Sequence, residues 1–257
     1  MIRRTGLLAL VVLGISPISA SSAPPDTPRT GAFAITLSPA ELLGEAAQKV
    51  APVIPVDEAI SWEVYVPEAY SADSPPGIVV YVSPSQSGSQ PPGWSGVMDE
   101  HNLIWISANH SGNRVLAPRR ALTAILALYA IQREYALDEE RVYVAGLSGG
   151  GKMASMIATD YARTFDGGFF ICGVEPWETD EPQELEAIRS NRYVFLAGER
   201  DQALKPTKHV YRQYRKAGVS DIELVVVPGM GHGSPPHREI SRAIEFLDTG
   251  VPGLKGA

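Results

Sequence analysis

The segment RVYVAGLSGGGKMASMIATD (residues 141–160) decides the fold, because glycines join an apolar run directly to a helix-forming run. The first run, RVYVAG, is rich in the β-branched and aromatic residues that favour strands. The second, GGKMASMIATD, has the spacing of apolar residues that is typical of a helix. A strand, a tight turn and a helix are therefore predicted here, which is the repeating unit of α/β proteins with parallel sheets.

Two motifs overlap in this turn. Residues 146–152 nearly complete the phosphate-binding pattern G-x-x-x-x-G-K-[ST], but its final hydroxyl, a magnesium ligand, is replaced by Met153. GLSGG (146–150) completes G-x-S-x-G, which presents a serine in a sharp turn and needs small residues on both sides of it. Because methionine cannot bind magnesium through a hydroxyl, we interpret the segment as a nucleophile elbow with Ser148 as the candidate nucleophile.

Strand-like and helix-like segments alternate along the rest of the chain. Their strands are continuous apolar runs, as expected of parallel strands covered on both faces. This order predicts an α/β fold with a doubly wound, mostly parallel sheet and helices on both faces. The expected strands are 61–67, 77–83, 103–108, 141–146, 167–174, 192–198 and 222–228, and the expected helices are 38–50, 118–136, 150–162, 181–190, 205–218 and 237–248.

A serine nucleophile needs a general base and an acid that orients it. Ligand sites in such sheets lie at the carboxyl ends of the strands, so residues that follow strands are the candidates. Of the five histidines, only His232 lies just past a predicted strand end. Asp201 follows the strand before it, with Glu199 and Glu175 as alternative acids. The order Ser148, Asp201, His232 predicts a catalytic triad.

These motifs together resemble the α/β-hydrolases of the esterase type, near the polyhydroxybutyrate depolymerase and feruloyl esterase group. The resemblance runs from about SWEVYVPEAY (61–70) to AIEFLD (243–248). It rests on YVAGLSGGGKMAS (143–155), FLAGERD (195–201) and VPGMGHGSP (227–235). It implies the α/β-hydrolase fold, a serine esterase activity without cofactor or metal, and the roles of nucleophile, acid and base for the three triad candidates. Only about 17 residues separate the strands around 174 and 192, so no large cap domain is expected.

The loop SPSQSGSQPPGW (83–94) departs from the pattern of that group. Its members commonly carry His-Gly there, and the next backbone N–H helps to form the oxyanion hole. Pro84 has no N–H to donate. The predicted oxyanion donors are therefore the N–H of Gly149 and an N–H from either Ser85 or Gln86.

Four further residues are candidates for the substrate-binding surface. Asn109 and His110 follow another predicted strand, and Trp94 and Trp177 are predicted to be loop aromatics. For both tryptophans, packing within the protein is the alternative interpretation. The single cysteine, Cys172, lies in an apolar run and is expected to be a small buried residue that forms no disulfide within the chain.

The first residues have the pattern of a signal peptide. Arg3 and Arg4 precede the apolar run GLLALVVLGI (6–15), which is shorter than the roughly 18–20 residues needed to span a membrane. Cleavage is expected after Ala20 or Ala23. The predicted organisation is a signal peptide at 1–23, a mobile leader at 24–37 and a hydrolase domain at 38–257.

Composition excludes some partners. Loss of residues 1–23, which carry two arginines and no acidic residue, changes the formal net charge from −7 to −9. Such an acidic protein has no electrostatic attraction to nucleic acid or to an anionic membrane. The expected function is a serine hydrolase, exported to the periplasm or the medium, that acts on small-molecule esters or polymer ends. A serine peptidase and a catalytically silent binding module remain the alternatives.

Overall fold

Residues 28–177 and 184–251 are described by the structure, a computed structural model. The predicted signal peptide and the first part of the predicted leader lie outside these residues. Among the helices described, none is long and apolar enough to cross a membrane.

The centre of the molecule is an eight-stranded sheet in the order β1-β2-β4-β3-β5-β6-β7-β8. Strands β3 to β8 are parallel, whereas β1 and β2 at one end are antiparallel to their neighbours. The predicted mostly parallel sheet is therefore confirmed. The strands are β1 (Gly31–Leu37), β2 (Ile60–Val66), β3 (Gly77–Val82), β4 (Leu103–Ala108), β5 (Val142–Leu147), β6 (Gly167–Ile171), β7 (Arg192–Gly198) and β8 (Ile222–Val227).

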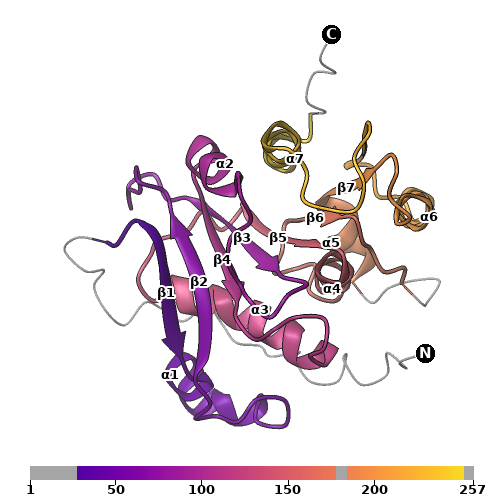
Figure 1. The fold of residues 1–257 in the computed structure, drawn as a ribbon. Coiled ribbons are helices and arrows are strands. Elements are labelled where there is room, and N and C mark those ends of the chain that lie inside the picture. Colours follow the sequence, from indigo (N-terminus) through magenta and orange to yellow (C-terminus); the bar gives the residue numbers. More distant parts are fainter. Residues whose placement is uncertain (1–27, 178–183, 252–257) are drawn as a thin grey trace.

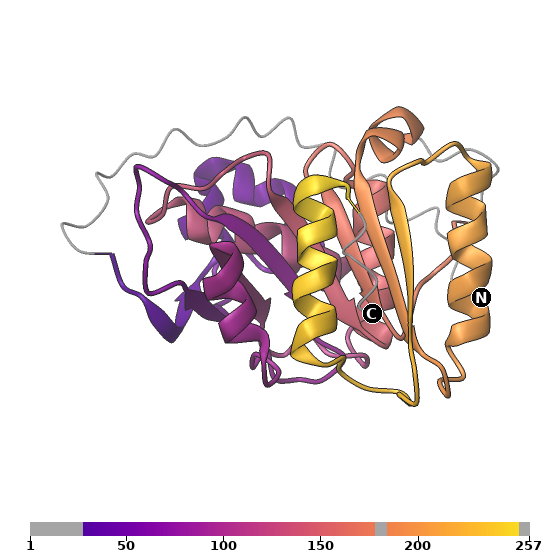
Figure 2. The same ribbon diagram turned by 90° about the horizontal axis from the view of Figure 1, so that it is seen from above.

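Helices cover both faces of the sheet, as predicted (Figure 1). Figures 1 and 2 show α2 and α7 together on one face, and α3 and α4 lie on the other. Each face buries its own apolar cluster against the sheet. The helices are α1 (Pro39–Leu43), the 3-10 helix η2 (Gly44–Lys49), α2 (Trp94–His101), α3 (Ala117–Gln132), α4 (Gly149–Asp160), α5 (Leu185–Ser190), α6 (Leu204–Lys216) and α7 (His237–Thr249).

Position in the sheet determines how the strands are buried. In β3, β4 and β6 every residue is buried, which matches their unbroken apolar sequences. In β2 and β8, near the ends of the sheet, burial alternates with exposure. The expectation that all strands are covered on both faces is therefore wrong for these two, because helices cover the outer strands less completely.

The predicted mobile leader is also wrong over part of its length. Residues 31–37 form β1, the edge strand, which pairs antiparallel with β2 from Gly31–Val66 to Leu37–Ile60. Phe33 points into the core, and Arg29 lies 4.3 Å above its ring. The sequence GAFAITL is short and alternating, and an edge strand needs only one apolar face.

A capping box at Ser38 begins α1. The Ser38 hydroxyl accepts the Glu41 N–H, and the Glu41 carboxylate accepts the Ser38 N–H. The predicted helix 38–50 is nevertheless divided, since α1 ends at Leu43 and η2 continues from Gly44, whose φ of 55° interrupts the α-helix. This peripheral segment packs against α3, far along the chain from the elbow.

Candidate active site

The turn around Ser148 has the conformation of a nucleophile elbow. Ser148 lies between β5 and α4 with φ 57° and ψ −121°, a region that costs non-glycine residues about 1–3 kcal/mol. Glycines make this turn possible, because a Cβ on Gly146 would lie 2.4 Å from the Gly150 carbonyl oxygen. A Cβ on Gly150 would lie 1.9 Å from the Val82 carbonyl oxygen on the neighbouring strand β3. The strain is therefore held by close packing at the carboxyl edge of the sheet.

The structure brings the three predicted triad residues together. The Ser148 hydroxyl lies 2.8 Å from His232 Nε2, and His232 Nδ1 lies 3.0 and 3.1 Å from the two Asp201 carboxylate oxygens. Asp201 follows β7 and His232 follows β8, so each comes from the carboxyl end of a different strand. With the Nδ1 proton directed at Asp201, Nε2 is the acceptor for the serine hydroxyl.

Exposure differs sharply between the acid and the base. The Asp201 side chain is 0% exposed and that of His232 is 42% exposed. Burial alone would raise the pKa of Asp201, but hydrogen bonds from the Ala203 N–H, Cys172 and His232 outweigh it and lower that pKa. Asp201 is therefore ionised at neutral pH and stabilises a protonated imidazole.

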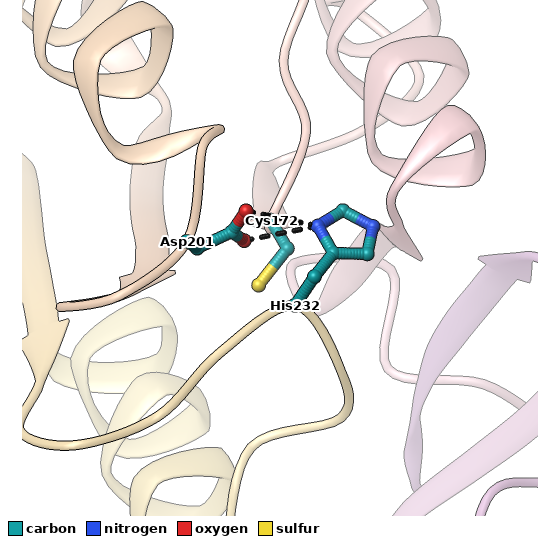
Figure 3. A group of neighbouring side chains, drawn as sticks. All are labelled: Cys172, Asp201 and His232. Atoms are coloured by element: carbon teal, nitrogen blue, oxygen red, sulfur yellow. Dashed lines mark hydrogen bonds and ion pairs between the residues drawn. The ribbon is translucent and has the colours of Figure 1, made fainter.

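Cys172 lies directly behind this pair (Figure 3). As predicted it is buried, but its thiol also donates to the Gly233 carbonyl, 3.5 Å away, on the loop that carries His232. Cys172, Asp201 and His232 form the one group among the described residues whose ligand atoms lie close enough to hold a metal, within 4.8 Å. Burial raises the pKa of the Cys172 thiol to about 11, and metals bind the thiolate. The chemistry of this set therefore fits a hydrogen-bonded triad better than a metal centre.

The alternative acids have other partners. The Glu199 carboxylate accepts the Gly229 N–H at 2.9 Å, and Glu175 pairs with Lys152 at 3.4 Å. Among the five histidines, His209 is exposed on α6, and His237 contacts the Gly93 carbonyl and Glu100 at the start of α7. Neither belongs to the group around Ser148.

Of the two oxyanion donors predicted in the loop after β3, only one has an N–H that is free within the described chain. The Ser85 N–H donates to the Ser83 hydroxyl at 3.2 Å. The N–H groups of Gln86 and of Gly149, the first residue of α4, have no acceptor within the part of the chain that the structure describes. Of the two predicted alternatives, the geometry therefore favours Gln86 as the partner of Gly149, because an oxyanion donor must be free before the substrate arrives.

Asn109 has a different role from the one predicted. Its side chain accepts the Gly88 N–H at 2.8 Å and donates to Ser61 and Glu63. Asn109 therefore holds the loop after β3 to the sheet, and both protons of its side-chain amide are already donated within the protein. His110 is exposed, with φ 53°, and its N–H donates to the Gln86 carbonyl at 2.6 Å. Its side chain remains a candidate for the surface of the site.

Asn113 lies in the loop after β4, four residues after Asn109, and was not among the predicted site residues. Its side chain lies so close to Gly149 that a Cβ there would be 2.1 Å from Asn113 Oδ1. The Asn113 side chain is exposed beside the elbow. The position of NHSGNR (109–114) after a strand was a usable signal, but it does not tell which of its residues points toward the serine.

The predicted substrate contacts of the two tryptophans are wrong. Trp94 begins α2 rather than lying in a loop and is 0% exposed, packed between Tyr81 and Phe169. Trp177 is buried against Tyr214 of α6, with ring centroids 4.5 Å apart. In both cases packing within the core, the alternative interpretation, is what the structure shows, because large aromatic side chains bury most apolar area there.

The triad is also separate from a pocket of about 290 Å³ on the face covered by α3. None of the triad residues lines that pocket. It is lined by Leu43, Leu122, Leu126, Tyr129 and Tyr161, among others. The position of the hydrogen-bonded polar groups, rather than cavity size, identifies the candidate active site.

The strand order, the elbow after β5 and the acid and histidine after β7 and β8 together define an α/β-hydrolase fold. Residues 124–203, which include the elbow and Asp201, match the model of the prolyl oligopeptidase family. No curated protein matches the chain at significant sequence similarity.

Solved structures of similar fold include members of the group expected from the sequence. A ferulic acid esterase has a TM-score of 0.61 at 15% identity, over 85% of this chain and 98% of its own. LpqC, a poly(3-hydroxybutyrate) depolymerase from Bordetella parapertussis, has a TM-score of 0.62 at 17% identity, over 88% and 92%. Dipeptidyl peptidase 4 from Porphyromonas gingivalis has a TM-score of 0.56 at 16% identity, but the match spans 75% of this chain and only 34% of that protein.

These likenesses establish the fold. The predicted α/β-hydrolase fold is thereby confirmed, as is the resemblance to the feruloyl esterase and depolymerase group at the level of structure. No large cap domain was predicted between β6 and β7. Among its described residues, this connection contains only the short helix α5.

Proposed function

We propose that this protein is a serine esterase that cleaves carboxylic esters through an acyl-enzyme, with Ser148 as nucleophile, His232 as general base and Asp201 as the orienting acid. The observation that carries the proposal is the unbroken chain of hydrogen bonds from the Ser148 hydroxyl through His232 to the buried Asp201 carboxylate. Such a chain is what activates a hydroxyl that is otherwise a poor nucleophile.

In the first half of the reaction, His232 Nε2 takes the hydroxyl proton as Ser148 Oγ bonds to the ester carbonyl carbon. The negative charge that develops on the carbonyl oxygen is met by the N–H groups of Gly149 and Gln86, and loss of one such donor typically costs about 2.7–4 kcal/mol. When the tetrahedral intermediate collapses, the bond to the alcohol oxygen breaks and His232 returns the proton to the leaving alcohol. The acyl group remains on Ser148.

In the second half, water occupies the place of the alcohol. The water oxygen attacks the acyl carbonyl while His232 Nε2 takes a proton from the water. The N–H groups of Gly149 and Gln86 again stabilise the oxyanion. The bond to Ser148 Oγ then breaks, the serine recovers its proton from His232, and the acid is released. Throughout, Asp201 holds the imidazole in the productive tautomer.

Access to the site supports small or terminal ester groups as substrates. The His232 side chain is 42% exposed, and the short connection between β6 and β7 leaves no large domain above the elbow among the described residues. The two relatives whose length this chain nearly matches, a ferulic acid esterase and a depolymerase, support an ester as the substrate.

A serine peptidase is the second candidate, and one observation favours it. The matched family model is that of prolyl oligopeptidases, and it covers the nucleophile elbow. The match spans only 34% of a dipeptidyl peptidase of the same fold, whereas it spans 98% of the ferulic acid esterase. The nearly full-length match favours the esterase.

The proposal includes export through the segment 1–23, supported by its two arginines and apolar run. Mass spectrometry of protein recovered from the periplasm and the medium tests this part separately. We expect a mature chain that begins after Ala20 or Ala23, and an uncleaved chain confined to the cytoplasm would contradict export.

A fluorophosphonate probe tests whether the serine is activated. We expect rapid covalent labelling of the wild-type protein and none of Ser148→Ala, with kcat for p-nitrophenyl esters lowered about 10⁴- to 10⁶-fold. Ser155→Ala is a matched control, because Ser155 is buried on α4 and bonded to the Lys152 carbonyl. Labelling of Ser148→Ala, or none of a folded wild-type protein, would overturn the enzymatic proposal.

Paired substrates separate the esterase from the peptidase. Short-chain and cinnamate-type p-nitrophenyl esters are compared with peptide p-nitroanilides under the same conditions. We expect the esters to be hydrolysed and the peptides to be resistant. Steady hydrolysis of the peptides with slow turnover of the esters would favour the peptidase instead.

A further inference from the structure

Arg120, on the first turns of α3, is a buried cation without a carboxylate partner. Its residue is 5% exposed, and no carboxylate of the described chain lies within 4 Å of its guanidinium. A charge in such a place is costly unless hydrogen bonds compensate it, and an apolar residue of similar volume would be cheaper. Burial lowers the pKa of Arg120 to about 10, so it is charged at neutral pH.

All three hydrogen-bonding partners of the Arg120 guanidinium are backbone carbonyls of segments at the candidate active site. Nε donates to Ser111 at 2.8 Å, one Nη to Ser83 at 2.9 Å and the other to Gly149 at 3.3 Å. These carbonyls belong to the loop after β4, the loop after β3 and the nucleophile elbow respectively. One rigid planar group therefore joins three separate segments of the chain.

The loop after β4 in turn fixes the segment that carries the Gln86 N–H. The His110 N–H donates to the Gln86 carbonyl at 2.6 Å, and the Asn113 N–H donates to the Pro84 carbonyl at 3.0 Å. The Ser111 carbonyl, held by Arg120, lies between these two contacts along the chain. On the other side Arg120 holds Gly149 itself, which supplies the second N–H.

We propose that Arg120 is a positioning residue of the oxyanion hole, which fixes the Gln86 and Gly149 N–H groups relative to one another. This inference rests on the proposed function. Two donors on separate loops stabilise an oxyanion only when their spacing is set before the charge develops, since reorganisation during the reaction would consume the gain. The three acceptors of the Arg120 guanidinium are uncharged carbonyl groups. A carboxylate in their place would lie beside the oxyanion hole and repel the developing negative charge.

The test compares Arg120→Met with Arg141→Met. Arg141 also binds two backbone carbonyls, of His101 and Asn102, but at the opposite edge of the sheet. For Arg120→Met we expect kcat to fall about 10- to 100-fold with KM within about threefold of wild type. The Ki of an aryl boronic acid, whose tetrahedral adduct with the serine places an oxygen in the hole, should rise in proportion. Arg141→Met should lower the melting temperature and leave kcat and this Ki unchanged.

The outcomes separate the two proposals. Absence of fluorophosphonate labelling in wild type would overturn the proposed function and this inference with it. Normal wild-type labelling with unchanged kcat and boronate Ki in folded Arg120→Met would overturn this inference alone, as would a rise in KM without a fall in kcat. Should Arg120→Met not fold, Arg120→Lys decides, because one ammonium cannot bond all three carbonyls in the same geometry. It should lower kcat several-fold at unchanged KM, and wild-type kcat would overturn the inference.

Discussion

Two clusters of charged residues lie at opposite edges of the same sheet, one at the amino ends of the strands and one at their carboxyl ends. They contain similar residues but serve different purposes. At the amino edge, Arg141 makes two hydrogen bonds of 2.9 Å with Asp248, which also accepts the Tyr143 hydroxyl at 2.8 Å. At the carboxyl edge, Arg120 has only neutral carbonyl partners, and the buried Asp201 is paired with a histidine that is largely exposed.

The difference follows from what each edge must do. At the amino edge, charges are paired so that α7 is held to the start of β5, and nothing there has to change charge. At the carboxyl edge, His232 must accept and return a proton, and a new negative charge must be tolerated beside Gly149. Of the four described non-glycine residues with positive φ, three lie at that edge, namely His110, Ser148 and Cys172, and the fourth, Asn102, precedes β4 at the amino edge. Stability and reactivity are therefore divided between the two ends of the strands.

Among the predicted effects, that of Asp201→Asn at the carboxyl edge is the largest. An asparagine amide can donate a hydrogen bond to His232 Nδ1, which then carries no proton, so the imidazole proton lies on Nε2. A protonated Nε2 cannot accept the serine proton. We expect kcat to fall about 10⁴-fold, while circular dichroism shows that the variant is folded at the assay temperature. Glu199→Gln is the control, because Glu199 lies two residues away and binds only the Gly229 N–H among its described contacts. A near-normal kcat in Asp201→Asn would show that another group orients His232.

A smaller effect, on stability alone, is expected from Asp248→Asn at the other edge. The substitution removes the charge that Arg141 and the Tyr143 hydroxyl share, and leaves a half-buried guanidinium without its counter-charge. We expect the free energy of unfolding in urea to fall by about 1–3 kcal/mol and kcat to stay within about twofold. A fall in kcat at a temperature well below melting would show that the two edges are coupled.

The parallel sheet and the grouping of Ser148, Asp201 and His232 could be predicted for a physical reason. Buried parallel strands have unbroken apolar runs, and side chains that follow such strands meet at the carboxyl edge of the sheet. The same reasoning left Glu199 and Glu175 open as acids, and the contacts in the structure single out Asp201. The elbow could be predicted because the backbone on both sides of Ser148 packs so closely that only glycine fits at 146 and 150.

Other features depend on contacts that periodicity does not encode. The strand at 31–37 was missed because its alternation rests on three large apolar residues only, Phe33, Ile35 and Leu37. Trp94 was misplaced because a helix of eight residues beginning after PPG has a weak periodic signal. Arg120 and Asn113 contact segments that are distant in the sequence, and one sequence does not tell which loops lie beside them.

The smallest predicted effect is a pH dependence of the stability that Asp201 and Asp248 contribute to the folded state. The pKa values of Asp201 and Asp248 are both lowered, in each case because hydrogen bonds to the carboxylate outweigh the effect of burial. An aspartate with a lowered pKa stabilises the folded state above the ordinary carboxyl range, near 3.9, and this contribution is lost as the pH falls through the lowered pKa. Asparagine has no such contribution at any pH. The difference in unfolding free energy between wild type and each Asp→Asn variant should therefore be larger at pH 7 than at pH 3, as measured by urea denaturation at both. A difference that stays constant or grows on acidification at either position would show that the carboxylate there is not favoured in its ionised form, and for Asp201 it would remove the charge that the proposed mechanism places beside His232.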